Sequence, residues 1–206
     1  TMELSLLNEL NTTFFNIVRA SGGNNEDRPL VLPTLVTNDS QEYVDSLAAT
    51  IETLNDSNII ATVHYYGLWH FSVNIAGYTT FNDEVKNSID TMVNNVNTLV
   101  SKGIPVVIGE YGILGYGKGE ETVERGEMLK YFEHFLHATQ SKNIATMMWD
   151  YGPYVNRTTF EWSDPELYNI IMHSLTGRTS TTSFDRIFIK SGETVSDQSV
   201  TLNLNG

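Results

Sequence analysis

Four short apolar segments alternate with amphipathic helical patterns along the chain, and this alternation restricts the fold more than any other feature of the sequence. The expected strands span residues 30–36, 58–66, 106–110 and 143–150. The expected helices span 3–20, Asp39 or Ser40 to Leu54, Asn82 or Asp83 to Val100, 120–142 and 164–175. Because strictly alternating elements imply right-handed crossovers, the sequence predicts an α/β fold with a parallel sheet. The first helix places four apolar side chains at helical spacing: Leu7, Leu10, Phe14 and Ile17.

A carboxylate follows the third strand. Val106, Val107 and Ile108 form a β-branched run that is typical of a buried parallel strand. Glu110 comes at its carboxyl end, and polar or aromatic residues end the neighbouring strands too. Because α/β folds keep their chemistry at the carboxyl ends of parallel strands, these residues are the candidate site. They are His64, Tyr66, Glu110, Trp149 and Asp150.

The segment between the second strand and the next helix is long and aromatic. It carries Trp69 and His70, and a loop of this kind is more often functional than disordered. Aromatic faces stack on the C–H faces of sugar rings, and a carboxylate beside them can attack an anomeric carbon. Trp69 and Trp149 are therefore candidate substrate-binding residues, with Glu110 as the reactive group.

The charge balance excludes several classes of partner. The chain has 12 Lys+Arg against 25 Asp+Glu, a formal net charge of −13, and no basic cluster. Nucleic acid and anionic membrane surfaces are therefore not expected partners, whereas a neutral or cationic ligand fits. The absence of cysteine excludes disulfides and thiolate metal sites. No apolar run is long enough to span a bilayer.

Two other kinds of site are weaker interpretations. Residues 112–118 match most of a phosphate-binding loop, but Gly119 stands where a hydroxyl should hold Mg²⁺, and Glu120 and Glu121 would repel phosphate. His64 and His70 could suggest a metal site, but no third candidate ligand follows at a spacing typical of metal-binding motifs. We therefore expect neither a metal nor a cofactor.

Three segments together resemble one family. Thr62-Val-His-Tyr-Tyr66, Ile108-Gly-Glu-Tyr-Gly112 and Met148-Trp-Asp-Tyr-Gly152 are similar to the sixth, seventh and eighth strand motifs of glycoside hydrolase family 5. Members of that family are endo-acting β-glucanases of the cellulase type on a (β/α)₈ barrel. Residues 18–33 resemble the family's fourth helix and fifth strand, and the resemblance extends from residue 3 to about 176.

The resemblance implies a role for each site residue. Glu110 matches the nucleophile of a retaining glycosidase, His64 and Tyr66 match residues that orient it, and Trp149 matches the sugar platform. The family's acid/base lies in an Asn-Glu pair that ends the fourth strand, before the first residue of this chain. Asn8-Glu9 is the same pair of residues, but it lies in the first expected helix, so we do not expect Glu9 to be the acid.

The expected architecture is half of a (β/α)₈ barrel, equivalent to strands five to eight, at residues 1–178. Residues 179–206 are expected to be a linker and the start of an immunoglobulin-like β segment. A second copy could complete the barrel as a homodimer and place Asp150 as the second carboxylate. The expected function is cleavage of β-1,4-glucan by a secreted bacterial enzyme whose signal peptide is not in this chain. The alternative is an inactive half-barrel that binds polysaccharide or self-assembles.

Overall fold

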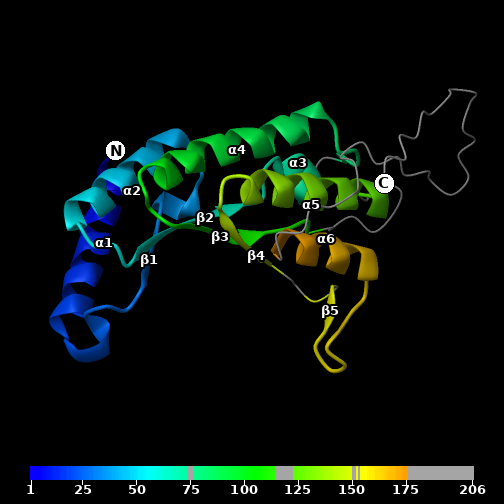
Figure 1. Cartoon of the computed structure of the whole chain (residues 1–206). Helices are drawn as coiled ribbons and strands as arrows, with labels where there is room; N and C mark the ends of the chain where they lie inside the picture. Colours follow the sequence, from blue (N-terminus) through cyan, green and yellow to red (C-terminus); the bar gives the residue numbers. More distant parts are fainter. Residues whose placement is uncertain (74–76, 115–122, 150–151, 153, 176–206) are drawn as a thin grey trace, which may run out of the picture.

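The computed structural model describes residues 1–73, 77–114, 123–149, 152 and 154–175. Its centre is a parallel sheet of four strands in the order β1-β2-β3-β4 (Figure 1). The strands are β1 (Leu30–Pro33), β2 (Ile59–Tyr65), β3 (Val106–Tyr111) and β4 (Ala145–Met148). The expected α/β fold with a parallel sheet is therefore confirmed, and the strand order follows the chain order.

Helices connect the strands. They are α1 (Met2–Ala20), α2 (Gln41–Leu54), α3 (Trp69–Ser72), α4 (Asp83–Ser101), α5 (Arg125–Gln140) and α6 (Pro165–Leu175), with short 3₁₀ turns η1 (Gly23–Asn25) and η2 (Leu35–Thr37). Figure 1 shows α4 and α5 along the same side of the sheet. A small antiparallel hairpin, β5 (Val155–Asn156) and β6 (Glu161–Trp162), precedes α6.

Several helix starts follow from local chemistry. The Asn82 side chain accepts a hydrogen bond from the backbone N–H of Val85 at 3.1 Å and so caps α4, which begins at Asp83. Asp164 does the same for α6, through the N–H groups of Glu166 and Leu167 at 3.0 Å. Ser40 occupies the N-cap position of α2, but its side chain makes no capping hydrogen bond. The cap position was thus predictable, although the bond was not.

Two expectations about the connections were wrong in part. The segment after β2 was expected to be a loop, but it contains α3, because Phe71 turns into the core and is fully buried. Helix α5 begins at Arg125 rather than near residue 120. The β5–β6 hairpin was not expected, because two-residue strands are too short to leave an alternating pattern.

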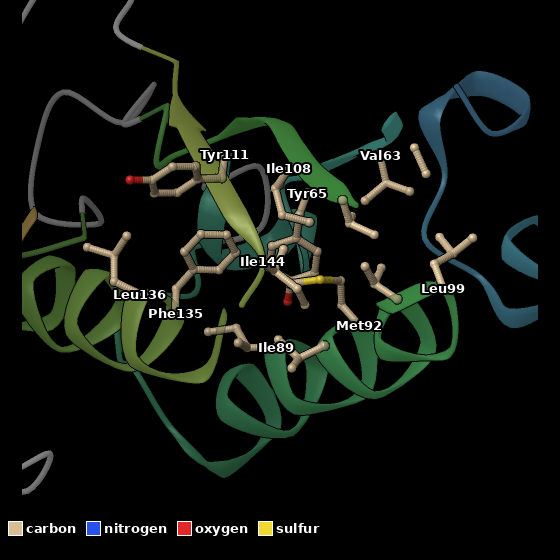
Figure 2. Packing of buried hydrophobic residues seen from close by; sticks show 14 of the residues in the cluster. Val63, Tyr65, Ile89, Met92, Leu99, Ile108, Tyr111, Phe135, Leu136 and Ile144 are labelled. Atoms are coloured by element: carbon tan, nitrogen blue, oxygen red, sulfur yellow. The ribbon is translucent and has the colours of Figure 1, made fainter. Parts of the chain in front are cut away.

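The core lies between the sheet and the helices. Alternate residues of β2 are buried and half-buried, so Val63 and Tyr65 face the helices whereas His64 faces the opposite side. Figure 2 shows these side chains meeting those of α4 and α5, such as Met92 and Phe135. Phe135 stacks on Tyr111 with ring centroids 4.3 Å apart and on Tyr65 at 5.7 Å. These aromatic rings pack the carboxyl ends of β2 and β3 against α5.

The opposite face of the sheet and one side of α1 are open. Val31 on β1 is 48% exposed and Met147 on β4 is 60% exposed. The first helix forms as expected, but its apolar stripe is not buried: Leu10, Phe14 and Ile17 are 57%, 45% and 65% exposed. The buried residues of α1 are instead Leu4 and Asn11. The exposure of the open face of the sheet is greatest at the two outer strands, because Val107 on β3 is only 9% exposed.

Part of the chain carries predictions that the structure does not address. The expected linker and β segment at 179–206, the glycine-rich residues 115–119 and Asp150 all lie outside the described residues. No helix among the residues described is long and apolar enough to cross a membrane.

A partly buried ion pair joins the end of α1 to the turn before β2 and provides a test of the packing. Arg19 Nε lies 2.8 Å from Asp56 Oδ2, and the Arg19 guanidinium also donates to the carbonyl oxygens of Asn25 and Arg28. The hydrogen bond from Arg19 is the main cause that lowers the pKa of Asp56 from its ordinary value of 3.8. A lowered pKa stabilises the fold above the unfolded pKa, and this stabilisation is lost as the pH falls through the folded one.

We therefore expect Asp56→Asn to lower the free energy of unfolding by about 1–2 kcal/mol at neutral pH. The difference from wild type should shrink as the pH falls below about 4. Urea unfolding at a series of pH values measures this, with Asp27→Asn, an exposed aspartate nearby, as the control. A difference that is constant down to pH 3 would contradict the assignment.

Candidate active site

The candidate site lies at the carboxyl ends of β2 and β3, on the open face of the sheet. His64 pairs with Glu110, and Tyr65 pairs with Tyr111. Tyr65 and Tyr111 are buried among the core aromatics, whereas the side chains of His64 and Glu110 are 31% and 36% exposed. The strand-end positions thus separate into two buried tyrosines and two accessible ionisable groups.

A register shift produces this arrangement. Val63 pairs with Ile108, but the next residue, His64, pairs with Glu110, so Gly109 is an additional residue in β3. The pairing with β4 shifts over the same stretch of β3. A bulge of this kind redirects the side chains that follow it. Here it places Glu110 on the open face and Tyr111 in the core.

Two side chains among the described residues contact the Glu110 carboxylate. The hydroxyl group of Tyr66 donates a hydrogen bond to Glu110 Oε2 at 2.8 Å, and His64 Nδ1 lies 3.4 Å from the same oxygen. Within the described residues, both contacts go to Oε2, and the Glu110 side chain as a whole is 36% exposed. The carboxylate is therefore held at one oxygen while its side chain remains partly accessible.

Two aromatic side chains, Tyr66 and Trp149, contact each other beside this carboxylate. The ring of Tyr66 meets the indole of Trp149 edge-on, with centroids 6.3 Å apart and an interplanar angle of 88°. The backbone N–H of Trp149 donates to the Tyr111 carbonyl at 2.9 Å, which fixes Trp149 at the end of β3. Trp149 remains 38% exposed. The structure therefore brings His64, Tyr66, Glu110 and Trp149 together, as their strand-end positions predict.

Trp69 lies on a different element, the short helix α3. It opens α3 and is 58% exposed, and the adjacent His70 packs on Tyr78 with ring centroids 5.3 Å apart. Phe81 anchors the end of this segment, because its N–H donates to Glu127 Oε2 at 2.6 Å. Within the described residues, no ring contact or hydrogen bond joins Trp69 to Glu110. The sixth candidate, Asp150, lies outside the described residues.

The buried tyrosines below the site remain neutral. Burial raises the pKa of Tyr65 and of Tyr111 well above the ordinary value, so both keep their protons at physiological pH. The Tyr65 hydroxyl donates to Ser88 Oγ on α4 at 3.0 Å. These tyrosines hold the strand ends in place, and neither is a proton donor for chemistry near neutral pH.

The two histidines do not form a metal site with other described residues. His64 contacts Glu110 and His70 contacts Tyr78, and the residues described here contain no group of three or more metal-ligating side chains. Sequence reasoning did not identify Gly109 as part of the site. The available signal was a glycine directly before the carboxylate, inside an otherwise β-branched strand.

The comparisons with known proteins agree with this geometry. The sequence profile described as "Cellulase (glycosyl hydrolase family 5)" matches residues 4–155. The chain belongs to glycosyl hydrolase family 5. It is 57% identical to Endoglucanase B of Paenibacillus lautus over 202 residues, which are 98% of this chain and 36% of that protein.

Solved structures place this family 5 chain on the same fold. It matches the full-length tri-modular endo-β-1,4-glucanase B of Bacillus halodurans with a TM-score of 0.80 and 48% identity, over 92% of this chain and 36% of that one. A tri-modular family 5 endo-β-1,4-glucanase of Bacillus licheniformis, solved with cellotetraose, matches with a TM-score of 0.71 and 29% identity over 85% of this chain and 32% of that one. The chain thus spans about a third of the length of these relatives, and its sheet is consistent with part of a (β/α)₈ barrel.

The bond between Tyr66 and Glu110 can be tested by stability. Tyr66→Phe removes the donor and should lower the free energy of unfolding by about 1 kcal/mol, because the bond goes to a charged but partly exposed acceptor. Tyr78→Phe is the matched control, since it removes a hydroxyl from the neighbouring aromatic group and should change stability less. Equal effects of the two variants in urea unfolding would contradict this assignment.

Proposed function

We propose that this chain is the part of a retaining β-1,4-glucanase that carries the catalytic nucleophile, Glu110. The observation that supports the proposal most directly is the carboxylate itself, held at Oε2 by Tyr66 and His64 and bordered by the accessible indole of Trp149. The family and the endoglucanases among its relatives point to the same substrate class.

Each residue then has a role in the first half of a double displacement. Oε1 of Glu110 attacks the anomeric carbon, so a glycosyl–enzyme bond forms as the glycosidic C–O bond breaks. A carboxylic acid on the opposite side of the sugar protonates the leaving oxygen. Tyr66 and His64 fix the attacking carboxylate, which reduces the reorganisation needed at the moment of attack.

Trp149 and Trp69 are proposed to hold the sugar chain. Trp149 is exposed beside Glu110 and stacks on the ring next to the scissile bond. Trp69, on α3, stands apart from this group and is assigned a more distant sugar unit. Because the substrate is neutral, these stacking faces and hydroxyl contacts replace the charge pairing that an ionic substrate would need.

The second carboxylate is proposed to come from another polypeptide. A retaining mechanism places its two carboxyl groups roughly 5 Å apart, across the sugar ring. The open face of the sheet and the apolar stripe of α1 favour a partner that closes the barrel. A second copy related by a two-fold axis would do this and would bring its Asp150 toward Glu110.

The location of the substrate suggests where the protein works. A glucan polymer does not cross a cell membrane, so we propose that the protein is secreted. Residues 1–178 are proposed to be the half-barrel unit, and residues 179–206 the start of an immunoglobulin-like segment.

The rival proposal is a chain that binds polysaccharide without cleaving it. It is favoured because Glu110 is the one carboxylate among the described candidate residues, whereas retaining hydrolysis needs two.

Hydrolysis of a soluble β-1,4-glucan by reducing-sugar release tests the role of Glu110. Glu110→Gln should reduce the rate to below about one thousandth of wild type, because the amide cannot form the covalent intermediate. Glu52→Gln, a carboxylate on α2 that pairs with Lys102, should retain the full rate. Equal rates for Glu110→Gln and wild type would reject the nucleophile. No hydrolysis by wild type, together with retention on insoluble cellulose, would support the binding protein.

Subunit mixing tests the second copy. Light scattering should give twice the chain mass of 23.1 kDa, and Glu110→Gln mixed with Asp150→Asn should recover activity, because one of the two sites in a heterodimer is intact. Each variant alone should be inactive. A stable monomer would reject the homodimer, and full activity of Asp150→Asn alone would reject Asp150 as the second carboxylate.

A further inference from the structure

Gly109 lies in β3 against Thr62 and His64 of the neighbouring strand β2. It is the additional residue of the β3 bulge and directly precedes Glu110. A Cβ atom built on Gly109 would lie 2.9 Å from Thr62 Oγ1, 3.1 Å from His64 Nε2 and 3.2 Å from His64 Cδ2. These distances are shorter than ordinary contacts between carbon and its neighbours, so a side chain at this position would displace one of the two residues.

The requirement for glycine here is one of space. The glycines of this chain with positive φ are Gly22, Gly23, Gly67, Gly77, Gly103 and Gly152 among the residues described, and Gly109 is not one of them. An alanine could therefore adopt the backbone conformation of Gly109 without strain. What a methyl group would meet is Thr62 Oγ1 at 2.9 Å and the edge of the His64 imidazole at 3.1 and 3.2 Å, which together occupy the volume that it would fill.

The two edges of that imidazole have different neighbours. Nε2 and Cδ2 lie over Gly109, whereas Nδ1 lies 3.4 Å from Glu110 Oε2. The ring is thus located between the bare backbone of β3 on one side and the carboxylate on the other. Displacing the ring at its Nε2 edge changes the position of Nδ1, because the imidazole is rigid.

We propose that Gly109 is a positioning residue of the site and that it acts through His64. The bulge places Glu110 on the open face, and the missing side chain lets His64 lie beside the Glu110 carboxylate. The importance of this contact for catalysis rests on the proposed role of Glu110 as nucleophile. The positioning itself does not, and it is tested without measuring activity.

The test follows the imidazole nitrogen resonances of His64 by NMR in the full chain. In wild type, Glu110→Gln should shift the Nδ1 resonance of His64, because a charged oxygen near it becomes a neutral amide. In Gly109→Ala, the same Glu110→Gln change should produce less than half of that shift. The resonances of the five histidines are assigned with a His64→Gln variant.

Gly103→Ala is the matched control. A Cβ at Gly103 would meet nothing within 4 Å, but its φ of +79° strains an alanine, so this variant loses stability without touching the site. It should lower the melting temperature and leave the response of His64 to Glu110→Gln unchanged. If the response of His64 also falls in Gly103→Ala, a general loss of stability, and not the side chain at position 109, weakens the contact between His64 and Glu110.

A second variant keeps the proposal testable if Gly109→Ala does not fold. Gly109→Ala combined with Thr62→Ala removes Thr62 Oγ1, the nearest atom, and leaves the imidazole as the group that the new methyl meets. This double variant should also lose more than half of the His64 response. If either folded variant responds to Glu110→Gln as wild type does, the new methyl group has not displaced the imidazole of His64, and the proposal is wrong.

Discussion

One-sided burial of the sheet determines where every strand side chain goes. Helices cover one face, so residues of β2 and β3 enter either the core or the open face according to their position in the strand. A regular β3 would place Glu110 and Tyr111 on the faces opposite to those observed. The register shift at Gly109 exchanges them, so the core gains an aromatic residue and the open face gains a carboxylate.

Much of this site could be predicted from sequence because it depends on local features. Short β-branched runs indicate parallel strands, and the carboxyl ends of parallel strands lie at one edge of a sheet. That rule alone brings His64, Tyr66, Glu110 and Trp149 together, although they come from three separate segments. The prediction did not separate Trp69 from the other candidate residues, because the short helix α3 that carries it depends on the burial of Phe71.

The features that sequence could not supply are those set by non-local packing. The register of β3 depends on its pairing with both β2 and β4, and Gly109, although it suggests a bulge, does not by itself fix that pairing. The stripe of α1 is similar: the spacing of Leu10, Phe14 and Ile17 predicts a helix, but not what covers it. Amphipathic spacing indicates which face of a helix is apolar, but it does not identify the element or protein that covers this face.

The open face of the sheet and the candidate site are the same surface. His64 shares a face with Thr62, which pairs with Val107, and Val107 pairs with Ala145 two residues before the exposed Met147. A polypeptide that buries this face therefore also brings groups opposite Glu110. While the face is open, a carboxylate that is 36% exposed interacts with its neighbours in a medium close to water, where electrostatic stabilisation is weak. Under the proposed closure of the barrel, the local dielectric constant around Glu110 would fall and its contacts with Tyr66 and His64 would strengthen. The proposal thus links the covering of this face to the electrostatics of the candidate site.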